Sequence, residues 1–340
     1  MTRVLDPQLV HPEQPKSTAR RGTRRVHPNI RARMMPTLGI EAAKLTLGTP
    51  ERRAELAPTA SRTWLVNRRA LAQSSIEPRI PDARGALGPV RRIGTYKGAG
   101  NRIGMYVVER EGTRVHLCAE SRLEMNVFRD VDRDPRTRWM HAQPFLLMWQ
   151  VDDACIWRVP DLVVRRGGSV VVIDVKPRAR VAENPYFALV THLTGLAMRY
   201  AGWGYEVHGS MSEQRAQNLR QVGRHRWVTP ALAERAERGS RARPRTLGRL
   251  WTLMGADDEA LMACMHLIGS GRVGADLDQP ITLSSVLEWP GDVPSGPDGR
   301  SLLDSAGPWF VGAVAEPQHQ RDPAATQLPL EGPWRADSNH

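Results

Sequence analysis

Two aspartates and a lysine in one short stretch have the types and the spacing that could hold a divalent cation. Asp161, Asp174 and Lys176 lie in the run 160–176, where segments rich in Val, Ile and Leu flank a Gly-Gly pair. This arrangement predicts a β-hairpin with a two-residue turn. In that register Asp161 faces Asp174 across the strands, and Lys176 shares their face. Because unpaired buried carboxylates repel each other, a divalent cation between them is the expected resolution.

Lys176 also stands out by composition. Only four of the 48 basic residues are lysines, and Lys176 is the only lysine beyond residue 97. Arginine does not lose its proton in proteins, whereas the lysine ammonium is a compact point charge that responds to burial. A single lysine in an arginine-rich segment suggests that its position requires an ammonium group.

The elements around the hairpin are expected to form an α/β layer. Apolar spacing and turn signals predict, in chain order, strands at 102–110 and 113–117, a helix at 119–130, strands at 139–149 (with an edge proline) and 155–159, the hairpin, a helix at 184–201 and a strand at 205–208. Helix, strand, hairpin, helix and strand in this order predict a mixed sheet flanked by helices.

Glu124 lies within the expected helix, next to Leu123 and Val127 and therefore toward the apolar side. A carboxylate at such a position is either part of a functional site or an ordinary helix carboxylate whose end reaches water. The sequence leaves both interpretations open.

The N-terminal part carries most of the net charge of +12. Residues 1–95 hold 18 of the 48 Lys and Arg but only 7 of the 36 Asp and Glu. Residues 1–92 are rich in Arg, Pro, Ser and Thr, which predicts a mostly disordered basic arm with a short helix near 40–47. A polyanion such as DNA is the expected partner, and a solvated extension without a partner is the alternative.

The C-terminal part separates into two regions. Residues 212–290 are expected to form three helices, at 230–238, 245–254 and 257–268, and then a small hairpin of 272–277 with 281–283, which is the order of a winged helix. Residues 224–249 contain eight Arg and two Glu, as a DNA-facing element would, although a helical protein-contact domain is the alternative. Residues 291–340 are expected to be a disordered tail. The α/β unit that contains the hairpin would then span 93–211.

Composition excludes several classes of protein. No run reaches the 18 or more apolar residues of a membrane span, and the N-terminus lacks the apolar region of a signal peptide. The three cysteines, Cys118, Cys155 and Cys264, are far apart. Their number and spacing exclude a disulfide framework and a CxxC zinc site, and they fit the reducing cytoplasm, where a DNA-binding chain would associate with the nucleoid.

Taken in order, Glu124, Pro160-Asp161 and Asp174-Val175-Lys176 resemble the PD-(D/E)xK nuclease motif. The wider pattern is similar to the TnsA family of heteromeric transposase endonucleases, over about residues 95–290. The stretches that carry this resemblance are 121–124 (Ser-Arg-Leu-Glu), 143–145 (Gln-Pro-Phe), 160–163 (Pro-Asp-Leu-Val), 174–177 (Asp-Val-Lys-Pro), 201–203 (Ala-Gly-Trp), 266–268 (His-Leu-Ile) and 274–277 (Gly-Ala-Asp-Leu). Glu120 matches no motif position and is taken as structural.

The resemblance implies a restriction-endonuclease-like fold and a defined role. Such a subunit hydrolyses DNA at the 5′ ends of a mobile element, beside a DDE-type transposase subunit and an AAA+ ATPase regulator. Asp161, Asp174 and the Val175 carbonyl would hold Mg²⁺, for which Mn²⁺ can substitute, and Glu124 would complete a second metal site or reach the first through water. Lys176 would orient the attacking water or stabilise developing charge. A stand-alone restriction or repair nuclease and a non-catalytic DNA-binding scaffold are the alternatives.

Overall fold

The structure is a computed structural model that describes residues 26–66, 70–76, 87–91, 103–110, 113–177, 183–296 and 300–303. Its elements, in chain order, are α2 (Pro28–Arg31), α3 (Ile40–Thr46), α4 (Pro50–Leu56), the 3₁₀ turn η1 (Ala57–Thr59), β1 (Ser61–Val66), β2 (Ala70–Ser75), β3 (Leu87–Gly88), β4 (Gly104–Arg110), β5 (Thr113–Ala119), α5 (Arg122–Arg133), β6 (Thr137–Ala142), β7 (Phe145–Val151), β8 (Ala154–Arg158), β9 (Leu162–Arg166), β10 (Ser169–Val175), α7 (Pro185–Tyr200), β11 (Gly204–His208), α8 (Glu213–Gly223), α9 (Pro230–Ser240), α10 (Leu247–Leu253), α11 (Asp258–Gly269), β12 (Gly274–Ala275) and β13 (Leu287–Glu288).

The predicted mixed sheet is present, with strand order β11-β10-β9-β6. Strand β11 runs parallel to β10, whereas β9 is antiparallel to both β10 and β6. Side chains alternate along β10: Val172 packs in the apolar cluster that contains α7, and Ile173 and Val175 pack in the cluster that contains α5. Helices α5 and α7 therefore cover opposite faces of this sheet. This arrangement confirms the mixed α/β class.

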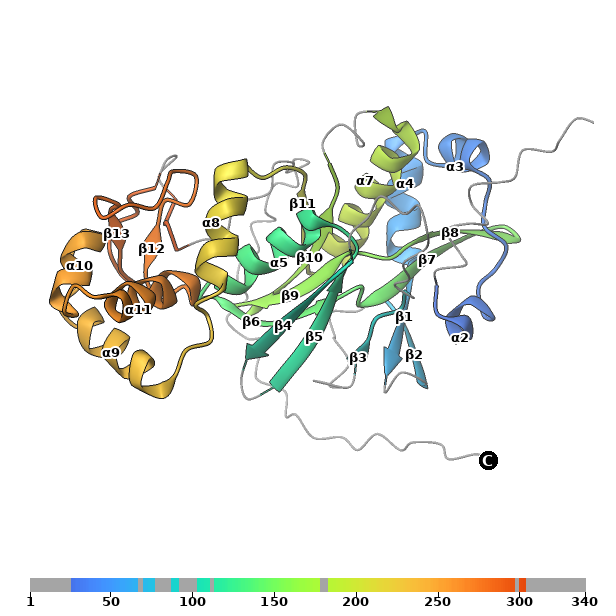
Figure 1. Cartoon of the computed structure of the whole chain (residues 1–340). Helices are drawn as coiled ribbons and strands as arrows, with labels where there is room; N and C mark the ends of the chain where they lie inside the picture. Colours follow the sequence, from blue (N-terminus) through green and yellow to red (C-terminus); the bar gives the residue numbers. More distant parts are fainter. Residues whose placement is uncertain are drawn as a thin grey trace, which may run out of the picture.

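The prediction of a mostly disordered arm over 1–92 is wrong for its described parts. The expected short helix is α3, and α2, α4 and β1–β3 surround it in the sequence. Strand β1 pairs with β7 in a second sheet of order β2-β1-β7-β8, so the arm belongs to the folded body (Figure 1). The arginine content of this segment suggested disorder, but an arginine can also be part of the folded core. Arg62 is fully buried, with its guanidinium 4.4 Å from the Trp203 ring centroid.

The strand predicted at 139–149 is two strands in two sheets. Strand β6 pairs with β9, whereas β7 pairs with β1 and β8. The chain changes sheet at Gln143, which has a φ of 49° and is followed by proline. An apolar run shows no break in hydropathy when both of its halves are buried, so periodicity could not locate this corner.

The C-terminal part begins with α8, a helix that the sequence did not reveal. Helices α9, α10 and α11 match the three predicted helices within a few residues. The predicted second strand at 281–283 is wrong, since β12 pairs with β13 at Leu287–Glu288. Of the tail predicted to be disordered from 291, the structure describes residues 291–296 and 300–303, and Leu303 is buried. The rest of that tail lies outside the described residues.

Helices α8–α11 gather at one end of the molecule, and α4 lies beside α7 over the sheets (Figure 1). None of the helices in the described residues is long and apolar enough to span a lipid bilayer.

Candidate functional site

The β9–β10 hairpin has the predicted register. Ser169 pairs with Arg166 and Ile173 pairs with Leu162, so the next positions in line are Asp161 and Asp174. Gly167 in the turn has a φ of 61°, a conformation that glycine adopts without a steric penalty. The two aspartates therefore lie at the open end of the hairpin, as the Gly-Gly spacing predicted.

Asp161 is buried and bound on one side by the end of β10. Its Oδ2 accepts hydrogen bonds from the Val175 backbone N–H and from Lys176 Nζ, both at 2.8 Å. Lys176 Nζ also donates to the Val175 carbonyl, at 3.1 Å. Burial alone would raise the pKa of Asp161, but the charges of Lys176 and Arg158 and these hydrogen bonds hold it below its usual value. Asp161 and Lys176 thus form an ion pair in which the carboxylate is buried and the lysine side chain is partly exposed.

Asp174 is fully buried and faces α7. Its Oδ2 accepts a hydrogen bond from the Tyr205 hydroxyl at 2.5 Å and lies 2.7 Å from Arg158 Nη2. Burial raises the pKa of Tyr205 well above its ordinary value, and the Asp174 charge raises it further, so Tyr205 remains a hydrogen-bond donor. Within the described part of the chain, Asp174 Oδ1 is buried without a hydrogen-bond partner.

Glu124 caps its own helix. Ser121, the N-cap of α5, accepts a hydrogen bond from the Glu124 N–H, and the Glu124 carboxylate accepts from the Glu120 N–H at 2.8 Å and from Ser121 Oγ at 3.2 Å. This is a variant of the capping box, in which the carboxylate binds the N–H of the residue before the N-cap. Burial, followed by the nearby charge of Asp161, raises the pKa of Glu124 to about 7. Glu124 is therefore coupled to Asp161, but it belongs to α5, on the face of the sheet opposite the Asp174 side chain.

Gln143 holds the backbone on the other side of Asp161. Its N–H donates to the Asp161 carbonyl at 3.0 Å, and its Nε2 donates to Glu120 Oε1 at 3.0 Å. The left-handed φ of Gln143 is costly for a residue with a side chain, and such strain tends to occur at functional sites. Gln143 thus connects the start of α5 to the residue that precedes β9.

Sequence reasoning missed Arg158 and Tyr205 as neighbours of Asp174. Arg158 is three residues before Asp161, at the end of β8, and this proximity was an available signal. Tyr205 lies near Asp174 because β11 runs parallel to β10. No local sequence pattern predicts which strand will pair in parallel with β10. Ser121 with Glu124 was also recognisable as the Ser-x-x-Glu signature of a capping box.

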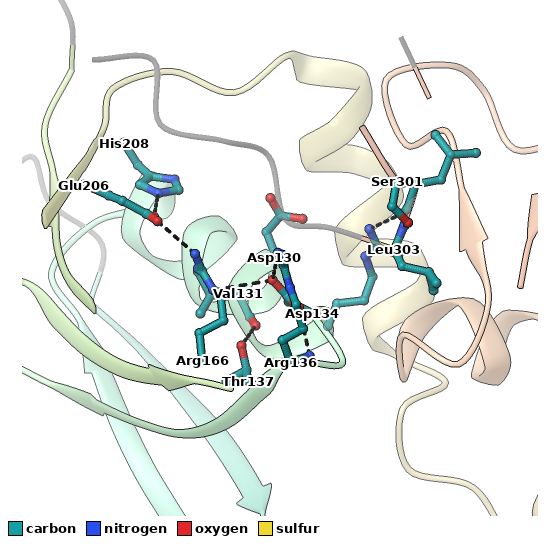
Figure 2. Close-up of polar contacts among 12 residues, drawn as sticks. Asp130, Val131, Asp134, Arg136, Thr137, Arg166, Glu206, His208, Ser301 and Leu303 are labelled. Carbon is teal, nitrogen blue, oxygen red and sulfur yellow. Dashed lines mark hydrogen bonds and ion pairs between the residues drawn. The ribbon is translucent and has the colours of Figure 1, made fainter. Parts of the chain in front are cut away.

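A polar network fixes the far end of α5 against the sheet (Figure 2). Asp134, the C-cap of α5, binds Arg136 at 2.8 Å and lies 3.4 Å from Arg166 of β9. Arg166 reaches Glu206 at 2.8 Å, and Glu206 in turn binds His208 at 2.8 Å. Helix α5 is therefore anchored to three strands or their ends at a distance from Glu124.

The same helix holds the C-terminal part. Arg215 of α8 binds Asp130 at 2.8 Å. Arg226, after α8, forms a close ion pair with Asp132 and also donates to the Tyr106 hydroxyl at 2.9 Å. Asp130 and Asp132 are both almost fully buried. The helix that presents Glu124 therefore also carries the main polar contacts to α8 and the loop after it.

The donor atoms suit a hard cation only in part. All the candidate ligands are oxygens, which Mg²⁺ prefers. Asp174 Oδ1, which has no hydrogen-bond partner among the described residues, could accept a cation. However, in the parts of the chain that the structure describes, no three His, Cys, Asp or Glu side chains gather as a metal-binding group. The described residues therefore offer Asp174 Oδ1 as a ligand position for a cation, with Asp161 beside it in the hairpin register and Glu124 on the opposite face of the sheet.

Comparison with known proteins adds no family: no protein-family model matches the chain, and no curated protein is significantly similar to it.

Proposed function

We propose that this chain is a metal-dependent DNA endonuclease that acts in the cytoplasm as the 5′-end-cutting subunit of a heteromeric transposase. The observation that carries the proposal is the hairpin end, where the register aligns Asp161 with Asp174 and Lys176 binds Asp161 at 2.8 Å. An acidic pair with an adjacent ammonium group, supported by a helix glutamate, is the set of groups that phosphodiester hydrolysis requires.

Asp161 and Asp174 would hold the Mg²⁺, or Mn²⁺ in its place, which supplies Lewis-acid activation of the phosphate and of the attacking water. Lys176 has a partly exposed side chain. Its Nζ can therefore reach the substrate phosphate while it remains bound to Asp161. There it would stabilise negative charge that develops on the phosphate oxygens.

Glu124 would serve as the group that holds or accepts a proton. Its pKa of about 7 means that both protonation states are populated near neutral pH, and a group with such a pKa is suited to general acid–base catalysis. The charge of Asp161 acts on Glu124 and raises its pKa. Hydrogen bonds from the Glu120 N–H and from Ser121 Oγ hold the Glu124 carboxylate in place. In this proposal Glu124 would accept a proton from the attacking water on the side of the site where Asp161 lies.

The C-terminal part would contact the DNA ends or a partner, either the DDE-type transposase subunit or the AAA+ ATPase. Within the arginine-rich stretch, α8–α11 and their loops leave several guanidinium groups exposed, at Arg238, Arg241, Arg243, Arg245 and Arg249. A cluster of exposed arginines matches the phosphate backbone of DNA. A winged-helix role for this part, and a restriction-endonuclease-like fold for the mixed sheet, belong to the same proposal.

The test is a nicking assay on plasmid DNA that carries the ends of the element, with Mg²⁺ and with the transposase subunit encoded beside this chain. Lys176→Ala and Asp161→Ala are each expected to lower nicking by at least about 100-fold, while DNA binding in a gel-shift assay is unchanged. Lys44→Ala is the matched control, because Lys44 lies in α3, away from the hairpin, and forms a partly exposed ion pair with Glu41.

Two results would overturn the proposal in different ways. Cleavage retained in Lys176→Ala or Asp161→Ala would reject the nuclease site itself. Metal-dependent cleavage of random DNA by the isolated chain would instead support a stand-alone nuclease, while loss of DNA cleavage in every mixture with intact DNA binding would support a scaffold.

A further inference from the structure

Arg158 brings a second positive charge to the acidic pair. It ends β8 in the second sheet and extends toward α7, where its guanidinium lies 4.6 Å from the Phe187 ring centroid. Its Nη2 is 2.7 Å from Asp174 Oδ2, and only 13% of its side chain is exposed. With Lys176 on Asp161 and Arg158 on Asp174, each aspartate has a cationic side chain beside it.

The two pairs differ in how well they are satisfied. Lys176 makes a hydrogen bond to Asp161 and a second one to the Val175 carbonyl. Arg158 Nη2 forms an ion pair with Asp174 Oδ2 at 2.7 Å, but neither Nη2 nor Nε has a well-aligned hydrogen-bond partner among the described residues. Buried polar atoms are normally paired. Arg158 therefore contributes charge to Asp174, and little directional bonding.

Asp174 remains open on its other oxygen. The Tyr205 hydroxyl binds Oδ2, the same atom that Arg158 faces, and Oδ1 has no hydrogen-bond partner in the described regions. A buried carboxylate oxygen with free lone pairs is a ligand position for a cation. A divalent ion on Oδ1 would lie close to the Arg158 guanidinium, and the two like charges would repel strongly at such short range.

We propose that Arg158 is the resident counter-cation of Asp174, which compensates this buried carboxylate when no divalent ion is bound and competes with that ion for it. The inference depends on the function proposed above for the identity of the ion. Arg158 is a positioning residue in this proposal, because it acts on Asp174 and not on the DNA. Charge holds Arg158 to Asp174, whereas a hydrogen bond from the Tyr205 hydroxyl positions the same carboxylate.

The first test measures Mn²⁺ binding to the full chain by electron paramagnetic resonance. Arg158→Gln is expected to bind Mn²⁺ roughly tenfold more tightly than the unaltered chain, since the repelling charge is gone. Arg158→Lys, which keeps the charge, is expected to stay near the unaltered value, and Asp174→Asn to lose binding. Equal or weaker Mn²⁺ binding by Arg158→Gln would overturn the proposal.

A second test needs no metal. Arg158→Gln leaves Asp174 buried without its counter-charge, so its melting temperature in EDTA is expected to fall. Adding Asp174→Asn to it is expected to restore part of that loss, because no uncompensated carboxylate remains. A double variant no more stable than Arg158→Gln would overturn the counter-cation role.

The two tests separate this inference from the proposed function. In one outcome, neither the unaltered chain nor any variant binds Mn²⁺, but adding Asp174→Asn restores part of the stability that Arg158→Gln loses. The proposed metal-dependent reaction is then wrong, Arg158 still compensates the charge of Asp174, and it does not compete with a metal ion. If Mn²⁺ binds in a manner that requires Asp174 but does not respond to Arg158→Gln, the metal site stands and Arg158 is not its competitor.

Discussion

Replacing Glu124 with glutamine is expected to stabilise the protein at alkaline pH and to have little effect at acidic pH. Burial and the charge of Asp161 raise the pKa of Glu124 from 4.5 to about 7. The folded state then binds this proton more tightly than the unfolded state, so stability falls as the pH rises from about 4.5 to about 7. Glutamine has no proton to lose and resembles the protonated side chain.

The size of the effect follows from the shift. A shift of about 2.5 pKa units corresponds to about 3 kcal/mol, since one unit is worth about 1.4 kcal/mol. Glu124 is only 7% exposed, so solvent screening reduces this value little. Glutamine is also accepted in a capping box. The unfolding free energy of Glu124→Gln should therefore exceed that of the unaltered chain by about 3 kcal/mol at pH 8 and by about zero at pH 4.5.

The assay is urea unfolding of both proteins at several pH values from 4.5 to 8, followed by circular dichroism. Glu213→Gln is the matched control: Glu213 also lies in the first turn of a helix, but its side chain is 88% exposed. The control should show no comparable change with pH. A difference between Glu124→Gln and the unaltered chain that stays constant across this pH range would refute the argument for a buried, proton-binding Glu124.

Two further substitutions test how α5 holds the C-terminal part. Asp132→Asn should destabilise the protein by roughly 3–5 kcal/mol in urea unfolding, since it removes the buried counter-charge of the partly buried Arg226 and Arg110. Gly271→Ala should destabilise it by roughly 3 kcal/mol or more, measured by thermal unfolding, because the new Cβ would collide with the carbonyl oxygen of Arg133 at a φ of +69°.

Both substitutions have controls in the same chain. Glu55→Gln removes one partner of an exposed ion pair with Arg52 and should change stability by less than about 1 kcal/mol. Gly202 has the same φ of +69° with nothing within 4 Å of a new Cβ, so Gly202→Ala reports the backbone strain alone, about 1–2 kcal/mol. If Gly271→Ala costs no more than Gly202→Ala, the close packing of Gly271 on α5 is refuted. An Asp132→Asn effect as small as that of Glu55→Gln would refute the buried ion pair.

Local patterns predicted the hairpin and the helices α3, α5, α7 and α9–α11 to within a few residues, although they missed α2, α4 and α8. The Gly-Gly turn and the flanking valines determined the register of β9 and β10, because side-chain alternation and turn length together leave one favourable pairing. Helix α7 begins after an Asn N-cap and ends before Gly202, close to the predicted bounds. Residues close together in the sequence determine these features, and periodicity reports the pattern of such residues.

Long-range pairing was not predictable in the same way. The arginine-rich composition of residues 1–92 indicated disorder, yet β1 pairs with β7 and Arg62 is buried against Trp203. The corner at Gln143 divides one apolar run between two sheets. In each case the decisive partner lies tens of residues away, so composition and spacing carry no signal for it.

The candidate site shows the same division. The sequence by itself determined that Asp161 and Asp174 meet at the end of a hairpin with Lys176 next to them, because register is a local property. Only the tertiary structure decided the rest: Asp174 faces α7 with Arg158 and Tyr205, whereas Glu124 lies on α5 at the opposite face. The packing of helices on a sheet and the choice of a parallel neighbour depend on the burial of whole faces, and these long-range contacts assign each charge its partner.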